Sequence, residues 1–255
     1  MIPKIIHYCW FGGNPLDKKS KKCIASWKKY CPDYEIVEWN ENNFDINSNQ
    51  YVKEAYEAKK WAFVTDYVRL YALYHVGGVY MDTDVELIKN IDCFLSHTAF
   101  SGYENDNQIP TAIMGSEKGG EWVKYLLDDY NGRAFVLENG EIDNSTNVET
   151  ITKLTKEKYD IDLDDKYIDV FGKVVFYPKE YFCPKSYVTG KIYKTKNTYS
   201  IHHFNASWVN KELQKSKIRR WKQYKIEYLI HMPNRTVMKL IGKEKYEKFK
   251  NFFNK

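Results

Sequence analysis

Two aspartates separated by one residue, Asp82 and Asp84, directly follow a short apolar run at residues 79–81. If the extended conformation of that run continues through them, both carboxylates point to one face. Two converging carboxylates repel each other unless a cation lies between them, and hard oxygen ligands of this kind suit Mg²⁺ or Mn²⁺. An ion held there could bind a diphosphate and stabilise the charge that develops as the diphosphate departs. An ordinary acidic turn after a strand has the same pattern, so the pair alone leaves both interpretations open.

A carboxylate and a guanidinium precede this pair on one predicted helix. Apolar residues at helical spacing predict that helix from Trp61 to His75, and two glycines, Gly77 and Gly78, end it. Asp66 and Arg69 lie at i and i+3, on one face of the helix, where a structural ion pair is the general expectation. Because this helix leads through the glycines into the D-x-D segment, both groups can instead face one cleft. There the carboxylate would accept hydrogen bonds from sugar hydroxyls, and the guanidinium would contact hydroxyls or phosphate.

The surrounding pattern predicts the start of a nucleotide-binding α/β sheet. A strand at 4–10, a lysine-rich helix at 17–30 with Asp17 as its N-cap, and a strand at 34–39 follow one another. A short helix at 50–60 comes next. Further along the chain, the same criteria predict strands at 99–103, 112–114, 174–177 and 199–203 and helices at 121–130 and near 148–158.

The length and composition predict one large α/β domain, or one domain with a small appendage. The 255 residues are 43% hydrophobic and 16% aromatic, which excludes a disordered or low-complexity chain. We find no apolar run of the roughly 20 residues that span a bilayer and no secretory signal, so we expect a cytoplasmic location. The five cysteines are scattered without a C-x-x-C pair, which indicates reduced thiols rather than a zinc or redox centre.

Charge is distributed unevenly along the chain. Of the 39 basic and 34 acidic side chains, 14 basic and four acidic ones lie within residues 211–255, giving that segment a charge of +10 and residues 1–210 a charge of −5. We therefore expect a catalytic domain at 1–210 and a basic helical extension at 211–255. The extension is either a solvated helical face or a segment that binds anionic lipid peripherally at the inner face of the cell membrane. Nucleic acid is not an expected partner, because no recognised motif accompanies the charge.

Three blocks of sequence occur in the order of a known family. The central block comprises residues 65–71 (TDYVRLY) and 77–84 (GGVYMDTD), an opening block comprises residues 2–13 (IPKIIHYCWFGG), and a third comprises residues 202–208 (HHFNASW). They resemble the sugar-binding and D-x-D region, the first strand and loop, and the C-terminal phosphate and metal motif of glycosyltransferase family 32. That family includes capsular-polysaccharide glycosyltransferases and yeast mannosyltransferases, and is similar to the catalytic domains of large clostridial glucosylating toxins. The resemblance implies an α/β fold of the GT-A type, in which helices flank a mixed nucleotide-binding sheet.

The resemblance implies roles in donor binding. Trp10 would stack on the nucleotide base, whose edge the Cys9 backbone would contact, although Trp10 could also be a core residue that closes its strand. Asp66 and Arg69 would hold the donor sugar. Tyr80 would line the donor pocket near the ribose or phosphate.

The resemblance also implies a metal shell and diphosphate contacts. Asp82 would bind the ribose hydroxyl and, through water, the metal, and Asp84 would ligate the metal directly. His203 would complete the shell as a neutral imidazole, with His202 as the alternative, since adjacent strand residues face opposite ways. In the third block, Ser207 and Trp208 would donate hydrogen bonds to the diphosphate. Trp208 could instead be a core residue.

Two departures from the family pattern limit what can be transferred. An asparagine often stands near the position of Thr111, so acceptor or sugar contacts there are in doubt. The acidic ligand that precedes the final tryptophan in the toxins is replaced here by histidine, so the metal preference can differ.

Together these features predict a metal-dependent, retaining glycosyltransferase that uses Mn²⁺ or Mg²⁺. It would move a hexose or N-acetylhexosamine from a nucleotide diphosphate sugar, with UDP as the expected nucleotide, to a bacterial surface polysaccharide or a lipid-linked oligosaccharide. A nucleotidyl or phosphoryl transferase also uses paired aspartates, but the sequence has no G-x-x-x-x-G-K-[ST] loop. A carbohydrate-binding protein that exploits the many aromatic faces is the non-catalytic alternative.

Overall fold

The computed structural model describes residues 1–109 and 112–205, and beyond them only the single residues 216, 218, 219, 221, 222, 242 and 245. Contacts divide the chain into two compact units, one of Met1–Lys185 with Ile192–Trp208 and one of Ser186–Lys191 with Val209–Lys255. Every described residue of the candidate site belongs to the first unit. The predicted helices of 211–255 lie almost entirely outside the described residues. Within the described residues, no helix is both long and apolar enough to span a membrane.

The first unit is built on a mixed sheet of seven strands in the order β2-β1-β3-β6-β5-β8-β7, with a separate two-stranded sheet of β4 and β9. Its strands are β1 (Ile5–Cys9), β2 (Glu35–Trp39), β3 (Gly78–Met81), β4 (Val85–Leu87), β5 (Ala99–Gly102), β6 (Ile113–Ser116), β7 (Ile168–Val170), β8 (Val174–Tyr177) and β9 (Ser200–His202). Its helices are α1 (Lys18–Tyr30), α2 (Gln50–Glu57), α3 (Trp61–His75), α4 (Glu121–Asp128), α5 (Asn147–Tyr159) and α6 (Lys179–Phe182).

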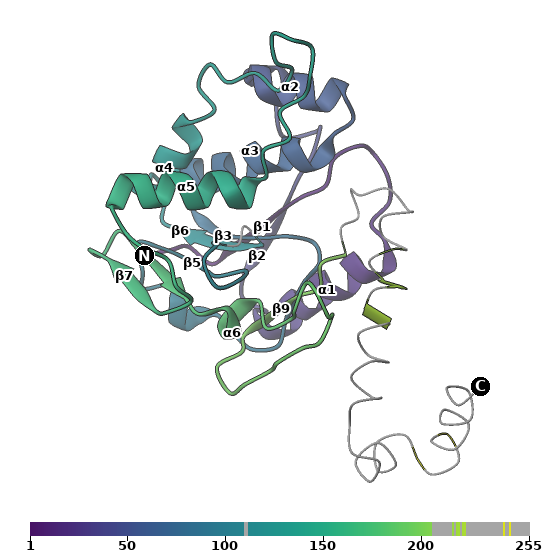
Figure 1. Cartoon of the computed structure of the whole chain (residues 1–255), viewed down its shortest axis with the longest axis vertical. Coiled ribbons are helices and arrows are strands. Elements are labelled where there is room, and N and C mark those ends of the chain that lie inside the picture. Colours follow the sequence, from purple (N-terminus) through teal and green to yellow (C-terminus); the bar gives the residue numbers. More distant parts are fainter. Residues whose placement is uncertain are drawn as a thin grey trace, which may run out of the picture. The chain divides into compact units, whose positions relative to one another are not determined.

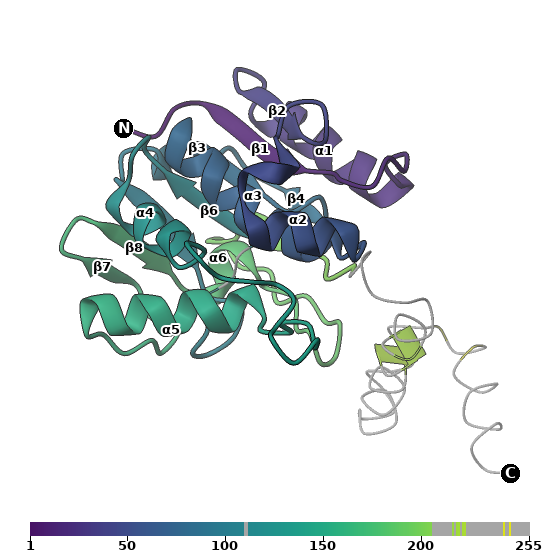
Figure 2. The same ribbon diagram turned by 90° about the horizontal axis from the view of Figure 1, so that it is seen from above.

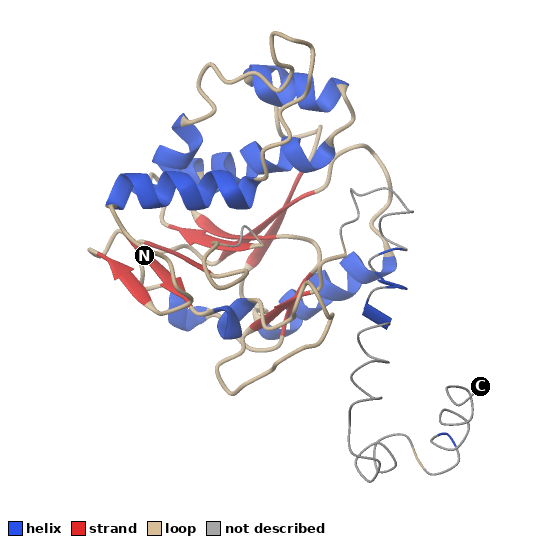
Figure 3. Cartoon of the chain, viewed as in Figure 1, coloured by secondary structure: helices blue, strands red, loops and turns tan. Residues whose placement is uncertain are grey.

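Helices cover both faces of the large sheet. Helices α2, α3, α4 and α5 lie together on one face, and α1, α6 and the small sheet lie on the other (Figures 1 and 3). Figure 2 shows the first group from above, with the sheet behind it. Each face has its own buried cluster: Trp122 and Val68 belong to the first, and Trp27 and Phe94 to the second. The predicted α/β fold with a mixed sheet flanked by helices is therefore confirmed, and it is consistent with the GT-A type.

The local signals near the start of the chain produce the expected elements. The Asp17 carboxylate accepts hydrogen bonds from the backbone N–H groups of Lys19 and Ser20, which caps α1 as its spacing predicts. Parallel pairing joins β1 to β2 on one side and to β3 on the other. This places the end of β1, at Cys9, next to the strand that carries the D-x-D segment.

Glycine permits the tight connection between α3 and β3. Gly77 and Gly78 have φ angles of +77° and +118°, which other residues rarely adopt. A Cβ atom on Gly78 would come within 2.7 Å of the Ile5 carbonyl oxygen. The helix therefore ends, and the strand enters the sheet beside β1, within two residues.

Four short features differ from the expectations. Three elements were not predicted, β4, β7 and α6, because three or four residues are too few to show a period. The D-x-D segment does not continue β3, the condition under which strand alternation would place both carboxylates on one face. The backbone N–H of Val85 donates to the Asp82 carbonyl oxygen at 3.0 Å, which closes a four-residue turn between β3 and β4. The two carboxylates are thus brought together by the turn instead of by strand alternation.

Candidate active site

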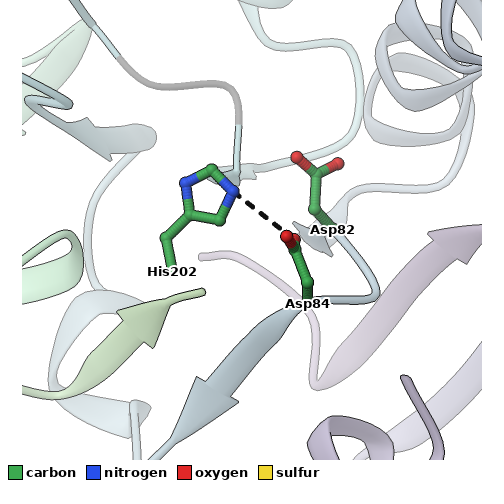
Figure 4. A group of neighbouring side chains, drawn as sticks. All are labelled: Asp82, Asp84 and His202. Carbon is green, nitrogen blue, oxygen red and sulfur yellow. Dashed lines mark ion pairs between the residues drawn. The ribbon is translucent and has the colours of Figure 1, made fainter. Parts of the chain in front are cut away.

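The D-x-D turn and the end of β9 bring three potential metal ligands together. One ligand atom each from Asp82, Asp84 and His202 lies within 4.8 Å of the other two. Figure 4 shows the imidazole and the two carboxylates converging from β9 and from the turn. His202 lies 118 positions after Asp84 in the sequence, and the pairing of β4 with β9 brings the two together.

Asp84 is held in place by the chain segment that follows β9. Its Oδ2 accepts the backbone N–H of Asn205 at 2.7 Å, and its Oδ1 lies 3.4 Å from Nε2 of His202. Burial by itself would raise the pKa of Asp84, but the charge of His202 and the Asn205 hydrogen bond lower it to about 2. Burial would likewise lower the pKa of His202, yet Asp84 and Cys183 hold it well above its ordinary value. Asp84 is therefore ionised throughout the physiological range.

The expected position of His203 is corrected by the strand pairing. Val85 pairs with His202 and Glu86 with Ile201, so His202 shares the inward face of the small sheet with Val85. His203 lies on the outward face, where its Nε2 contacts the Glu86 carboxylate at 2.8 Å. The alternative residue, His202, is thus the histidine that adjoins the aspartates, and His203 is turned away from them.

The donor set fits a divalent cation such as Mn²⁺. Two carboxylates and one imidazole are the mixture of hard and intermediate ligands that Mn²⁺ accepts. Nδ1 of His202 is buried without an oxygen or nitrogen partner among the described residues, although the Cys183 thiol lies beside the ring. Oδ1 of Asp82 accepts a hydrogen bond from Tyr80, which orients the carboxylate. These residues could hold the ion; the geometry does not identify which metal it is.

Arg69 connects the two predicted acidic groups of the site. Its side chain is only 6% exposed, with Nη2 at 3.0 Å from Asp66 Oδ1 and Nη1 at 3.4 Å from Asp82 Oδ1. The guanidinium carbon lies 4.6 Å from the centre of the Tyr80 ring, and the Tyr80 hydroxyl donates to Asp82 Oδ1 at 2.7 Å. The predicted pair of Asp66 and Arg69 is therefore an ion pair that also faces the D-x-D turn, so the two interpretations do not exclude each other.

Asp66 lies in a buried environment that disfavours its charge. Burial raises its pKa to about 6, against the opposing effects of Arg69 and of a hydrogen bond from Asn147. The Asn147 amide donates from Nδ2 to Asp66 Oδ1 at 2.9 Å. A carboxyl group poised at this pKa can change its protonation state within the range in which enzymes operate.

Asn147 is a site residue that sequence reasoning missed. It is the first residue of α5, behind the cap residue Thr146, and it is 8% exposed. The capping box at Thr146 and Glu149 predicts where the helix begins but not which residue its first side chain meets. The contact with Asp66 joins positions 81 residues apart, and no local pattern signals it.

The two residues expected at the nucleotide base lie at the end of β1. Cys9 is buried and Trp10 is partly exposed. The backbone N–H of Trp10 donates to the Trp39 carbonyl oxygen at 2.9 Å. The Trp10 indole N–H donates to the Asn14 carbonyl oxygen, which fixes the ring next to the loop that contains Gly12 and Gly13. The ring packs against the second buried cluster, which contains Trp27 and Phe94, but it is only partly buried there. Stacking on a base stays a prediction.

Three residues singled out in the sequence fall outside the described residues. These are Ser207 and Trp208, expected at the diphosphate, and Thr111, which stands where the family often has asparagine. Their expected roles stay predictions.

Comparison with known proteins places this geometry in context. Residues 17–101, which include the whole D-x-D turn, match the family model described as a glycosyltransferase sugar-binding region containing a DXD motif. The chain is 31% identical over 142 residues to inositol phosphoceramide mannosyltransferase 3 of Schizosaccharomyces pombe, covering 52% of this chain and 38% of that protein. It is 27% identical over 188 residues to an uncharacterized glycosyltransferase of Acanthamoeba polyphaga mimivirus, covering 66% of this chain and 73% of that protein.

The solved structures add little to this. The PaToxG glycosyltransferase superposes with a TM-score of 0.47 at 18% identity, covering 62% of this chain and 70% of that one, which is too low to carry an argument. The chain also spans less than half the length of the fungal relative. The family match, which contains the whole D-x-D turn, supports a chain similar to the glycosyltransferases with a D-x-D sugar-binding region, of the family-32 type.

Proposed function

We propose that this chain is a metal-dependent, retaining glycosyltransferase. It moves a hexose or N-acetylhexosamine from a nucleotide diphosphate sugar, with UDP as the expected nucleotide, to a growing bacterial surface polysaccharide or a lipid-linked oligosaccharide. The observation that carries the proposal is the convergence of Asp82, Asp84 and His202 next to the buried network of Arg69. A cation-binding corner and a carboxylate that can accept sugar hydroxyls thus lie side by side.

The chain's own residues divide the task of binding the donor. Asp66, when ionised, accepts hydrogen bonds from sugar hydroxyls, and Arg69 holds Asp66 and Asp82 at fixed distances. The Tyr80 hydroxyl orients Asp82 through Oδ1. Mn²⁺ or Mg²⁺, when bound by Asp82, Asp84 and His202, supplies positive charge that stabilises the departing nucleoside diphosphate.

The contacts of the three carboxylates support a front-face displacement over a covalent intermediate. Asp66 is engaged by Arg69 and by the Asn147 amide, Asp82 by Tyr80 and Arg69, and Asp84 by the Asn205 N–H. Each is therefore held by hydrogen-bond donors that reduce its nucleophilicity. In the displacement, the bond from the anomeric carbon to the phosphate oxygen breaks while the bond to the acceptor oxygen forms on the same face. The acceptor proton passes to the departing phosphate oxygen.

The relatives and the charge of the chain support an acceptor carried by a lipid. The fungal relative is named a mannosyltransferase acting on inositol phosphoceramide, which supports transfer of a hexose to an acceptor carried by a lipid. The +10 charge of residues 211–255 would bring the protein to an anionic membrane surface, where such acceptors are found. Neutralising several of these lysines should weaken binding to vesicles containing anionic lipid while binding to neutral vesicles stays unchanged.

A panel of nucleotide sugars tests the function. We expect hydrolysis of one donor to be activated by Mn²⁺ and abolished by chelation, with release of the nucleoside diphosphate and the free sugar. Release of pyrophosphate would indicate a nucleotidyl transferase instead. Binding of glycans without any binding of nucleotide would indicate a carbohydrate-binding protein and would overturn the proposal.

A further inference from the structure

Two lysines from distant parts of the chain meet beside the D-x-D turn. Lys19, in α1, donates from Nζ to the Asn205 side-chain oxygen at 3.1 Å. Lys185, in the loop after α6, donates from Nζ to the His203 carbonyl oxygen at 2.8 Å. Both ammonium groups thus contact the segment 203–205, and the backbone N–H of Asn205 in that segment holds Asp84. Positive charge is concentrated immediately next to the candidate metal ligands.

This arrangement is unfavourable for folding alone. Lys19 lies in the first turn of α1, whose N-terminus is capped by the Asp17 carboxylate. Lys185 is half-buried, and burial together with the charge of Lys19 lowers its pKa. The two ammonium groups thus repel each other, although the charge of Asp84 partly offsets this effect at Lys185.

A neighbouring lysine of the same helix shows the contrast. Lys22 lies 3.9 Å from the Glu86 carboxylate, and Glu86 also contacts His203 on the outward face of the small sheet. That lysine therefore has an acidic partner near the limit of ion-pair distance. Lys19 has no carboxylate within ion-pair distance in the part of the chain that the structure describes, so an anion from outside would complete its environment.

We propose that Lys19 and Lys185 bind the diphosphate of the donor, as two cations that flank the departing nucleoside diphosphate opposite Asp82 and Asp84. This inference rests on the proposed function and deepens it, because it assigns the contacts to phosphate that the metal ligands do not make. The two ammonium groups hold phosphate oxygens through charge-assisted hydrogen bonds.

Calorimetry with nucleosides that carry zero, one or two phosphates tests the inference in the presence of Mn²⁺. Lys19→Ala should weaken binding of the nucleoside diphosphate by about tenfold and Lys185→Met by about thirtyfold. Affinity for the bare nucleoside should be unchanged in both variants. Lys28→Ala, an equal change of charge near the opposite end of α1, is the matched control and should bind as the wild type does.

The outcomes separate this inference from the proposed function. If the wild type binds no nucleoside diphosphate with Mn²⁺, both fail. If the wild type binds it and the two lysine variants bind it equally well, the inference alone is overturned. If the variants lose nucleoside and diphosphate affinity alike, the lysines have only a structural role and the inference also falls. Lys19→Ala removes an exposed side chain, so its folding is expected to be intact even where Lys185→Met is destabilised.

Discussion

The candidate site has two sides that the chain assembles in different ways. The helix side comprises Asp66, Arg69, Tyr80 and Asp82, which lie within 17 consecutive residues on α3, β3 and the turn. The strand side comprises Asp84 with His202 and Asn205, which meet only because β4 pairs with β9. The first side is buried and internally paired, whereas the second leaves an imidazole nitrogen without an oxygen or nitrogen partner among the described residues. In the proposed function, the first is a preformed sugar-binding side and the second is a metal-binding side.

Removing the charge of Asp84 breaks the strand side most severely. Asp84→Asn keeps the size of the side chain but removes the anionic ligand, so metal-dependent donor hydrolysis should fall by at least about a thousandfold. Steady-state kinetics at saturating Mn²⁺ measures this. Thr83→Ser, a conservative change in the same turn, is the control and should retain activity. Activity of Asp84→Asn within tenfold of the wild type would contradict a metal-binding role.

Removing Arg69 breaks the helix side and should act on folding as well as on activity. Arg69→Met leaves Asp66 buried without its ion-pair partner, which should cost about 3 to 5 kcal/mol of stability in urea unfolding. The double variant Asp66→Asn with Arg69→Met removes both charges and should recover most of that loss. A single variant as stable as the wild type would show that the ion pair does not organise this side.

The two adjacent histidines distinguish the strand side from its outer surface. His202→Ala should weaken Mn²⁺ binding by about a hundredfold, because it removes a ligand that adjoins Asp84. His203→Ala should change it by less than about threefold, because that ring contacts Glu86 on the opposite face. Isothermal titration with Mn²⁺ compares the two variants. The reverse order of effects would restore the original expectation for His203.

The pH dependence sharpens the contrast at Asp66. Because the pKa of Asp66 in the folded protein, about 6, lies above its ordinary value of 3.8, this group lowers stability as the pH rises from about 4 to about 6. Activity should rise over the same interval, since the ionised carboxylate is the form that accepts sugar hydroxyls. Opposite trends in unfolding free energy and in kcat/KM are thus expected, after separate correction for the effect of pH on metal binding.

Asn147→Ala tests the second partner of the Asp66 carboxylate, the amide that donates a hydrogen bond to it. The amide hydrogen bond favours the ionised form of Asp66. Its loss should therefore raise the midpoint of the acidic limb of the pH profile of kcat/KM by about half a pH unit to one pH unit. Asn147→Asp, which places a second carboxylate there, should raise it further. An unchanged midpoint in both variants would remove Asp66 as the group responsible for that limb.

Much of the helix side could be predicted from the sequence because its determinants are local. Helical spacing gives α3, the glycines give the sharp entry into β3, and the i and i+3 positions of Asp66 and Arg69 place both on one face. The proximity of the two aspartates was also predicted, although the physical reason is a turn instead of a continued strand. These features need no knowledge of distant segments.

The strand side could not be predicted in full because it depends on tertiary pairing. Which of the two adjacent histidines faces the aspartates is decided by the register of β4 against β9, and β4 is too short to detect from its pattern. The contacts of Asn147 and of the two lysines likewise join residues far apart in the sequence. Residue types signalled the chemistry of this side, and only the fold reveals its partners.

Anomalous diffraction from crystals grown with Mn²⁺ and a nucleoside diphosphate tests the central claim most directly. The account predicts one strong manganese peak bounded by Asp82, Asp84 and His202, with phosphate oxygens completing its coordination. A peak at His203 and Glu86, or no peak near the D-x-D turn while the nucleotide is bound, would contradict it.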